Sequence, residues 1–226
     1  MTVQTLELKS ADNLRTINET LQQAESGSFK ITRPSGHHAV AAGLMNGIDV
    51  EIDGHTGYYC AGMNKNANVT VNGNAGQGLA ENIMSGTVRV KGNASAAAGA
   101  TGHGGLIVIE GDASSRCGIS MKGVDIVVGG SVGHMSAFMA QAGHLVVCGD
   151  AGGYLGDSIY ETIIYVGGKV ESLGADCIEK DMTEDHVAAL KGLLERAGID
   201  ADPATFRRYG SARKLYNFDV DNAGEY

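Results

Sequence analysis

The chain of 226 residues has room for one hydrophobic core, or for a repeat array with short flanking pieces, but not for several independent enzyme domains. Its 17 basic residues against 26 acidic residues give a formal net charge of -9, which disfavours binding to nucleic acid or to an anionic membrane. Glycine is abundant, at 34 residues against 2 prolines, and the absence of a Gly-X-Y period excludes collagen.

Residues 1–49 are expected to form an N-terminal cap. Alternating leucines near the start indicate a short strand, and residues 10–23 have the apolar spacing of a helix that Gly27 ends. Residues 29–32 then look extended, and the turn at residues 33–36 is expected to lead into the part of the chain that follows.

The same N-terminal segment bears on localisation. Its longest apolar stretch, residues 39–45, is far shorter than a bilayer span, and the first residues include acidic side chains but no apolar core of a signal peptide. The sequence therefore predicts a soluble protein that is not secreted, with a cytoplasmic location and no contact with a membrane.

Residues 50–182 consist of seven copies of a 19-residue repeat without insertion. Numbered from its first apolar residue, each repeat has Val, Ile or Leu at position 1, Val or Ile at position 3 and Gly at position 5. The seven glycines at position 5 are Gly54, Gly73, Gly92, Gly111, Gly130, Gly149 and Gly168. Position 8 is small in six of the repeats and position 12 in all seven, so the underlying pattern is G-x-x-G-x-x-x-G.

This pattern predicts an all-β fold in which each repeat is one coil of a solenoid. Alternation at positions 1 and 3 indicates a short strand with one buried face, and the following glycine suits a corner with unusual dihedrals or no room for a side chain. Stacking the strands in parallel would bury continuous apolar ladders. The ladder at position 1 would comprise Val50, Val69, Val88, Ile107, Ile126, Leu145 and Ile164.

We therefore expect a single-stranded right-handed parallel β-helix of about seven 19-residue coils, flanked by short helical segments. The handedness follows from the usual chirality of parallel connections. Leucine-rich repeats are set aside because these repeats lack their leucines and an Asn or Cys ladder. Left-handed hexapeptide helices are set aside because 19 is not a multiple of six.

Residues 183–226 are expected to form a helical segment and a tail. Thr183 can cap a helix that carries Val187, Leu190 and Leu194 on one face and ends at Gly198. Asp202 and Pro203 then form a second pair of residues suited to a helix start.

The tail combines basic and aromatic residues, which interface cores favour. These residues are Phe206, Arg207, Arg208, Tyr209, Arg213, Lys214, Tyr216 and Phe218. Two interpretations stay open: docking on a partner subunit, or folding back to cover the last coil.

The cysteines and most histidines do not predict a reactive or metal site. Cys60 and Cys117 share position 11 but lie three coils apart, beyond disulfide reach, and buried free thiols are the preferred interpretation. His103, His134 and His144 fall at positions 16, 9 and 19, on different sides of the rod, so no metal cluster is expected.

Two further features have competing interpretations. His37 and His38, with Arg33 nearby, could reach a partner or a substrate channel, although a polar turn explains the same residues and is preferred. The glycines at 102, 104 and 105 and at 152–153 resemble phosphate loops but lack the strand and helix of a dinucleotide site. We therefore predict no catalytic, cofactor-binding or metal-binding residue in this chain.

The glycine ladder resembles the C-terminal β-helix domain of the large subunit of glutamate synthase. The similarity covers nearly all of the repeat region and extends to the exit segment Glu184-Asp185-His186-Val187. For a separate chain of this size, the closest resemblance is to the β-helix subunit of N-methylglutamate synthase. In that family, separate polypeptides correspond to the amidotransferase, β-helix and FMN-binding parts of glutamate synthase.

The resemblance implies a non-catalytic scaffold that holds an amidotransferase-like subunit and an FMN-binding subunit, with FMN and an iron–sulfur cluster in a partner. The implied overall reaction transfers methylamine to glutamate with loss of ammonia. This chain begins Met1-Thr2, without the cysteine nucleophile of the amidotransferase, and has no cysteine cluster. One alternative is a scaffold of another FMN-dependent complex or of formylmethanofuran dehydrogenase. A less favoured one is a free-standing β-helix enzyme acting on acidic polysaccharide.

Overall fold

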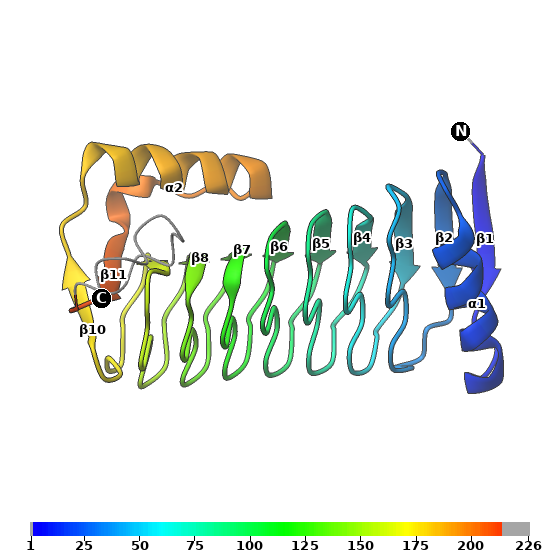
Figure 1. Cartoon of the computed structure of the whole chain (residues 1–226), viewed down its shortest axis with the longest axis horizontal. Helices are drawn as coiled ribbons and strands as arrows, with labels where there is room; N and C mark the ends of the chain where they lie inside the picture. Colours follow the sequence, from blue (N-terminus) through cyan, green and yellow to red (C-terminus); the bar gives the residue numbers. More distant parts are fainter. Residues whose placement is uncertain (1, 214–226) are drawn as a thin grey trace, which may run out of the picture.

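The computed structural model describes residues 2–213, which form a rod with one helix at its N-terminal end and a second helix alongside its later strands (Figure 1). Eleven strands make one sheet in the order β1-β2-β3-β4-β5-β6-β7-β8-β9-β11-β10. The elements are β1 (Val3–Glu7), α1 (Ala11–Gln23), β2 (Ser28–Thr32), β3 (Asp49–Asp53), β4 (Asn68–Val71), β5 (Thr87–Val90), β6 (Leu106–Ile109), β7 (Lys122–Val128), β8 (Ala142–Val147), β9 (Ile163–Val166), β10 (Cys177–Lys180), α2 (Glu184–Ala197), the short 3-10 helix η1 (Pro203–Thr205) and β11 (Arg207–Ser211).

The repeat forms the predicted parallel β-helix. From β3 to β9 each strand pairs in parallel with the next one along the chain, and equivalent residues such as Val50, Val69 and Val88 face each other. Residues at positions 1 and 3 are buried in every coil and form one continuous core. A second, single-residue contact between coils recurs at position 7, for example from Ala94 to Ala113.

In the coils that start with β3 to β8, the far side is built from left-handed residues. Positions 10, 12 and 14 of these coils have positive φ, as in Ala97 (59°), Gly99 (69°) and Thr101 (55°), whereas in the coil that starts with β9 the only residue with positive φ is Asp176. Position 12 also points into the rod, where a Cβ on Gly99 would lie 2.5 Å from Ile126 Cδ1. This explains the small residues at position 12, because the site combines an unfavourable dihedral with little space.

Lack of space, and not an unusual dihedral, explains most of the glycines at position 5. Among these seven only Gly54 has a positive φ, at 138°. A Cβ on Gly111 would lie 2.2 Å from Asn93 Oδ1 and 2.9 Å from Gly92 O of the preceding coil. Position 8 is small for the same reason, since a Cβ on Gly76 would lie 2.5 Å from Gly57 C.

The β-helix begins earlier than the 19-residue repeat indicates. Strand β2 pairs in parallel with β3, and β1 pairs in parallel with β2. The coil that starts at Ser28 has 21 residues before its equivalent, Asp49, so a fixed period of 19 misses it. The turn at residues 33–36 therefore lies inside this first coil and does not precede the solenoid.

Helix α1 covers the N-terminal end of the core. Ser10 is its N-cap residue, and Ile17 and Leu21 are buried against the first coil. The helix ends at Gln23, four residues before the glycine that was expected to stop it.

The C-terminal segment folds back along the rod. Thr183 Oγ1 accepts a hydrogen bond from His186 N at the start of α2, and Gly198 ends the helix in the left-handed conformation, both as predicted. Asp202 caps η1 through Ala204 N. In Figure 1, α2 runs along the long axis of the rod, over the half that holds the later strands. Within the described residues no helix is long and apolar enough to cross a bilayer.

The tail contributes strand β11, whose pairing with its neighbours in the sheet is antiparallel. Strand β11 lies between β9 and β10 and pairs antiparallel with both, while Phe206 and Tyr209 are buried. For residues 206–213 the structure therefore supports folding back onto the last coil. Lys214, Tyr216 and Phe218, which were part of the same prediction, lie outside the described residues.

Candidate functional site

The outward face of the strands differs between the two halves of the rod. Position 2 of each coil points away from the core, and its character changes from polar to apolar along the chain. The residues at this position are Glu51, Thr70, Arg89, Val108, Val127, Val146 and Tyr165. We call the face of β2–β5 the open face and that of β6–β9 the covered face.

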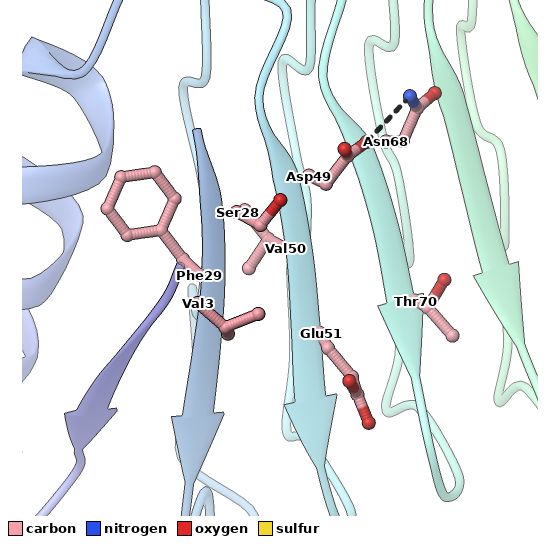
Figure 2. Close-up of a pocket in the computed structure, with 8 residues that line it drawn as sticks. All are labelled: Val3, Ser28, Phe29, Asp49, Val50, Glu51, Asn68 and Thr70. Atoms are coloured by element: carbon pink, nitrogen blue, oxygen red, sulfur yellow. Dashed lines mark hydrogen bonds between the residues drawn. The ribbon is translucent and has the colours of Figure 1, made fainter. Parts of the chain in front are cut away.

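The open face carries charged side chains that pair with one another. Lys30 Nζ lies 3.5 Å from both Glu51 Oε1 and Asp53 Oδ2. Figure 2 shows the adjoining pocket of about 350 Å³, in which Asn68 Nδ2 donates a 3.0 Å hydrogen bond to Asp49 Oδ1. The pocket is shallow and mixes these polar groups with Val3 and Phe29.

Helix α2 packs on the covered face. Leu190, Leu193 and Leu194 form a second apolar cluster with the strand residues beneath them, separate from the core inside the rod. Arg89 marks the boundary between the faces, since its Nη2 donates a 2.7 Å hydrogen bond to Ala197 O at the last residue of α2. Leu193 was not among the residues that sequence reasoning placed on the apolar side of this helix.

An acid–base cluster lies at the edge of the covered face. The Asp125 carboxylate contacts His144 Nδ1 at 2.8 Å and accepts a 3.0 Å hydrogen bond from Arg196 of α2. Burial of Asp125 by itself raises its pKa, but the hydrogen bonds and charges of His144 and Arg196 outweigh burial and hold the pKa below 3.8. The cluster thus joins two neighbouring strands to α2.

A second contact between α2 and the sheet involves Tyr165 and His186, whose hydroxyl and Nδ1 lie 3.2 Å apart. Burial raises the pKa of Tyr165, so the hydroxyl stays protonated at neutral pH. Burial, together with the nearby charge of Arg208, lowers the pKa of His186. A neutral imidazole can accept the hydrogen bond that the tyrosine donates.

The coils are also linked by a polar ladder that the sequence analysis did not recognise. Side chains at position 6 accept hydrogen bonds of 2.7 to 3.0 Å from the backbone N–H one coil later. The acceptors are His55, Asn74, Asn93, Asp112, Ser131 and Asp150. The ladder mixes His, Asn, Asp and Ser, so it differs from the uniform Asn or Cys ladder of leucine-rich repeats. The sequence signal for this ladder was the polar acceptor that directly follows six of the seven glycines at position 5.

The four cysteines are free and unsuited to nucleophilic chemistry. Burial raises the pKa of Cys60 and Cys117 to about 12, and that of Cys148 and Cys177 to about 11. The thiolate is the reactive form, so these thiols stay unreactive at neutral pH. Their placement agrees with the interpretation of Cys60 and Cys117 as buried, unpaired side chains.

The paired histidines of the first coil have structural contacts. His38 stacks on Tyr58 with ring centroids 4.5 Å apart, and its Nδ1 accepts a 2.9 Å hydrogen bond from Tyr58 N. Arg33 Nη1 instead donates a 3.0 Å hydrogen bond to Glu7 Oε1 on strand β1. These contacts favour the polar-turn interpretation.

The other histidines and the glycine clusters also belong to the coils. His103 and His134 are exposed on different coils, and only His144 of the three enters a polar cluster. Among residues 2–213, no group of three or more His, Cys, Asp or Glu side chains is placed to hold a metal ion. A Cβ on Gly102 would meet Val124 Cγ1 at 2.8 Å, and one on Gly152 would meet His134 N at 2.9 Å. These glycines are therefore needed for coil packing.

Comparison with known proteins gives one informative result. No protein-family model matches the sequence. Among curated proteins, protein GlxC of Rhizobium meliloti (strain 1021) is 58% identical over 218 residues, a match that covers 94% of this chain and 96% of that protein. The similarity therefore spans the solenoid together with most of the segments at its ends.

Proposed function

The chain belongs to the same family as protein GlxC, and on this premise we propose that it is a non-catalytic scaffold subunit of a heteromeric glutamate-synthase-like enzyme. The glycine-ladder β-helix supports the comparison with glutamate synthase, because the ladder resembles the repeat of the C-terminal β-helix domain of that enzyme. The preferred overall reaction is that of N-methylglutamate synthase, in which methylamine and glutamate give N-methylglutamate and ammonia.

The main support for the proposal is that the cysteines and the main acid–base cluster of this chain have structural roles. The inward positions of the coils are filled by packed apolar residues and protonated thiols. The main acid–base cluster is used to hold α2 on the sheet. What the rod offers to other molecules is its long outer surface, as expected of a scaffold.

Under this proposal the chemistry belongs to two partners. An amidotransferase-like subunit would handle the amine donor, and a subunit that binds FMN and an iron–sulfur cluster would carry the redox centres. The cysteines of this chain do not suit a cluster, because iron–sulfur ligation needs several thiolates around one centre. Cys60 and Cys117 are instead separated by three coils, and their thiols are buried.

Co-expression with the products of the neighbouring genes tests the proposal. The expected result is a stable heteromer with the absorption spectrum of FMN and with methylamine-dependent formation of N-methylglutamate, while the isolated chain is inactive. A chain that remains a solitary monomer with every neighbouring product would overturn the scaffold role. A heteromer with formylmethanofuran dehydrogenase activity would keep that role and replace the reaction. Turnover of uronic-acid polymers by the isolated chain would instead favour the polysaccharide enzyme.

A further inference from the structure

The side of the rod built from left-handed residues has the composition of a protein interface. We call positions 9, 10, 13 and 14 of the successive coils the turn face, and we name each coil by its strand. In the coils of β2 to β8 these positions hold only three residues with formal charge, Glu81, Arg116 and Asp157, although the chain carries a net charge of -9. Four of the eight large exposed apolar side chains of the described residues lie on this face: Tyr58, Met63, Met139 and Tyr154.

These large side chains form two ridges. The first lies on the β3 coil, where Tyr58 and Met63 are 58% and 48% exposed. The second lies on the β7 and β8 coils, where Met139 and Tyr154 are 42% and 60% exposed. Tyr and Met are enriched in protein interfaces, whereas charged residues are depleted from interface cores.

Midway between the ridges, on the β5 coil, the turn face is made of small residues, whereas the β4 and β6 coils on either side also carry longer ones, among them Gln77, Glu81, Arg116 and Ile119. At these positions the β5 coil has Ala96, Ala97 and Thr101, which are half-buried, and Ala100, which is buried. At about 4.8 Å per coil, the β3 and β7 coils lie roughly 19 Å apart. An α-helix with its side chains is about 10–12 Å across, so one helix can lie over the alanines between the ridges.

Two opposite charges flank the alanines. Glu81 lies on the coil before them and Arg116 on the coil after them. Within residues 2–213, no salt bridge or side-chain hydrogen bond engages either group. A bound element could therefore place a basic group opposite Glu81 and an acidic group opposite Arg116, so that neither charge is buried without a partner.

We propose that the turn face binds a helix of a partner subunit, seated over the β5 coil between the two ridges. The proposal rests on the function proposed above and names the surface through which the scaffold holds one of its partners. The helix would have an apolar face with small residues at its centre, a basic group toward Glu81 and an acidic group toward Arg116.

A second copy of this chain fits the surface less well. If two copies met by a two-fold axis through the β5 coil, the β3 ridge of one would face the β7 ridge of the other. The large side chains would then collide while the alanines remained apart. A partner helix that fills the space over the small residues of the β5 coil would avoid this collision. Interface cores are packed as closely as protein interiors, so such a fit is required.

The substitution Ala97→Glu tests the proposal in the native heteromer. The next coil has an arginine at the same position and with the same backbone conformation, since φ is 59° at Ala97 and 58° at Arg116, so the fold accepts a long charged side chain there. Thr70→Glu on the open face is the matched control. Each new carboxylate lies one coil from an arginine, Arg116 or Arg89.

We expect Ala97→Glu to weaken partner binding at least tenfold while Thr70→Glu binds as the wild type does, as measured by size-exclusion chromatography and titration of the purified subunits. Circular dichroism should show unchanged folding in both. If Ala97→Glu disturbs the fold, Met139→Lys probes the second ridge at an exposed position and should weaken binding as well.

The outcomes separate the two proposals. A wild-type chain that never forms a heteromer overturns the proposed function. If the wild type forms a heteromer and a folded Ala97→Glu or Met139→Lys variant binds the partner as tightly as the wild type does, the turn-face proposal alone is overturned. If Thr70→Glu abolishes partner binding and Ala97→Glu retains it, the contact lies on the open face and the turn-face proposal is overturned. The helix proposal would also be overturned if the chain associates with itself and Ala97→Glu abolishes this self-association without weakening partner binding.

Discussion

The open and covered faces of the same sheet have the same inward side and different outward sides. Positions 1 and 3 are buried from β3 to β9, whatever lies outside them. Position 2 is Glu51, Thr70 and Arg89 on the first three of these coils and apolar on the next four. The change coincides with the end of α2, where Arg89 holds the last carbonyl of that helix.

The comparison shows that the repeat encodes the solenoid, whereas the residues between the repeated ones encode what covers it. A strand with only its inward face apolar suffices where water lies outside. The covered face is apolar on both sides, as sheets are when helices pack on them. The following substitutions test this division, from the largest expected effect to the smallest.

Substitution of a corner glycine should be the most damaging change, and equally so in both halves. Gly111→Val places a branched side chain against Asn93 Oδ1 and the backbone of Gly92, and should lower the free energy of unfolding by about 4 kcal/mol. Gly73→Val, on the open half, should cost a similar amount, since its Cβ would lie 2.7 Å from Gly54 O. Chemical denaturation monitored by circular dichroism measures both. A variant that melts like the wild type would show that the coil has room at this corner.

Truncation under α2 should distinguish the two faces. Leu194 is buried between the helix and the covered face, so Leu194→Ala should lower the free energy of unfolding by about 3 kcal/mol. Thr70→Ala on the open face should change it by less than about 0.5 kcal/mol. Urea denaturation gives both values. Equal, small losses would mean that α2 adds little to the stability of the solenoid.

The repeat made most of the fold predictable. A glycine and two apolar residues at constant spacing imply equivalent strands, because only stacking in register buries their shared apolar edge. The helix from Thr183 to Gly198 was predictable from its terminal residues. The first coil was not, since its 21 residues fall outside the period, and its parallel pairing with β3 depends on three-dimensional stacking.

The acid–base cluster was much harder to predict. Asp125 and His144 share position 19 on neighbouring coils, so the repeat numbering could have paired them, but His144 was compared only with histidines at other positions. Arg196 comes from 71 residues further along the chain, and no periodicity places it. The apolar run at position 2 after residue 106 was the available signal for a cover on the later strands.

Removing one member of the polar ladder should have a moderate effect. Ser131→Ala, on the covered half, deletes the acceptor for Asp150 N, which is 3.0 Å away, and should lower the free energy of unfolding by about 1 kcal/mol. The ladder runs through both halves, so Asn74→Ala should cost as much. Thermal denaturation followed by circular dichroism suits this comparison. A clear difference between the two variants would show that the ladder matters more in one half.

The smallest expected effect is a pH dependence of stability that arises from Asp125, at the edge of the covered face. Asp125 is 17% exposed, and its folded pKa lies below the ordinary value of 3.8 because His144 and Arg196 outweigh the effect of burial. Its contribution to stability is therefore fully present above pH 3.8 and is lost as the pH falls through the lower, folded pKa. Asp125→Asn removes this titration, so its difference in unfolding free energy from the wild type should shrink in acid.

The measurement is a series of urea denaturation curves from neutral pH to below the folded pKa, for the wild type and for Asp125→Asn. Other carboxylates contribute equally to both proteins, so the difference between the two curves isolates Asp125. Arg196→Met, which removes one of its two side-chain partners, should give an intermediate pH dependence. Parallel curves for the wild type and Asp125→Asn would mean that the carboxylate interacts equally in the folded and unfolded chain. The contact between α2 and the covered face would then owe its stability to apolar packing alone.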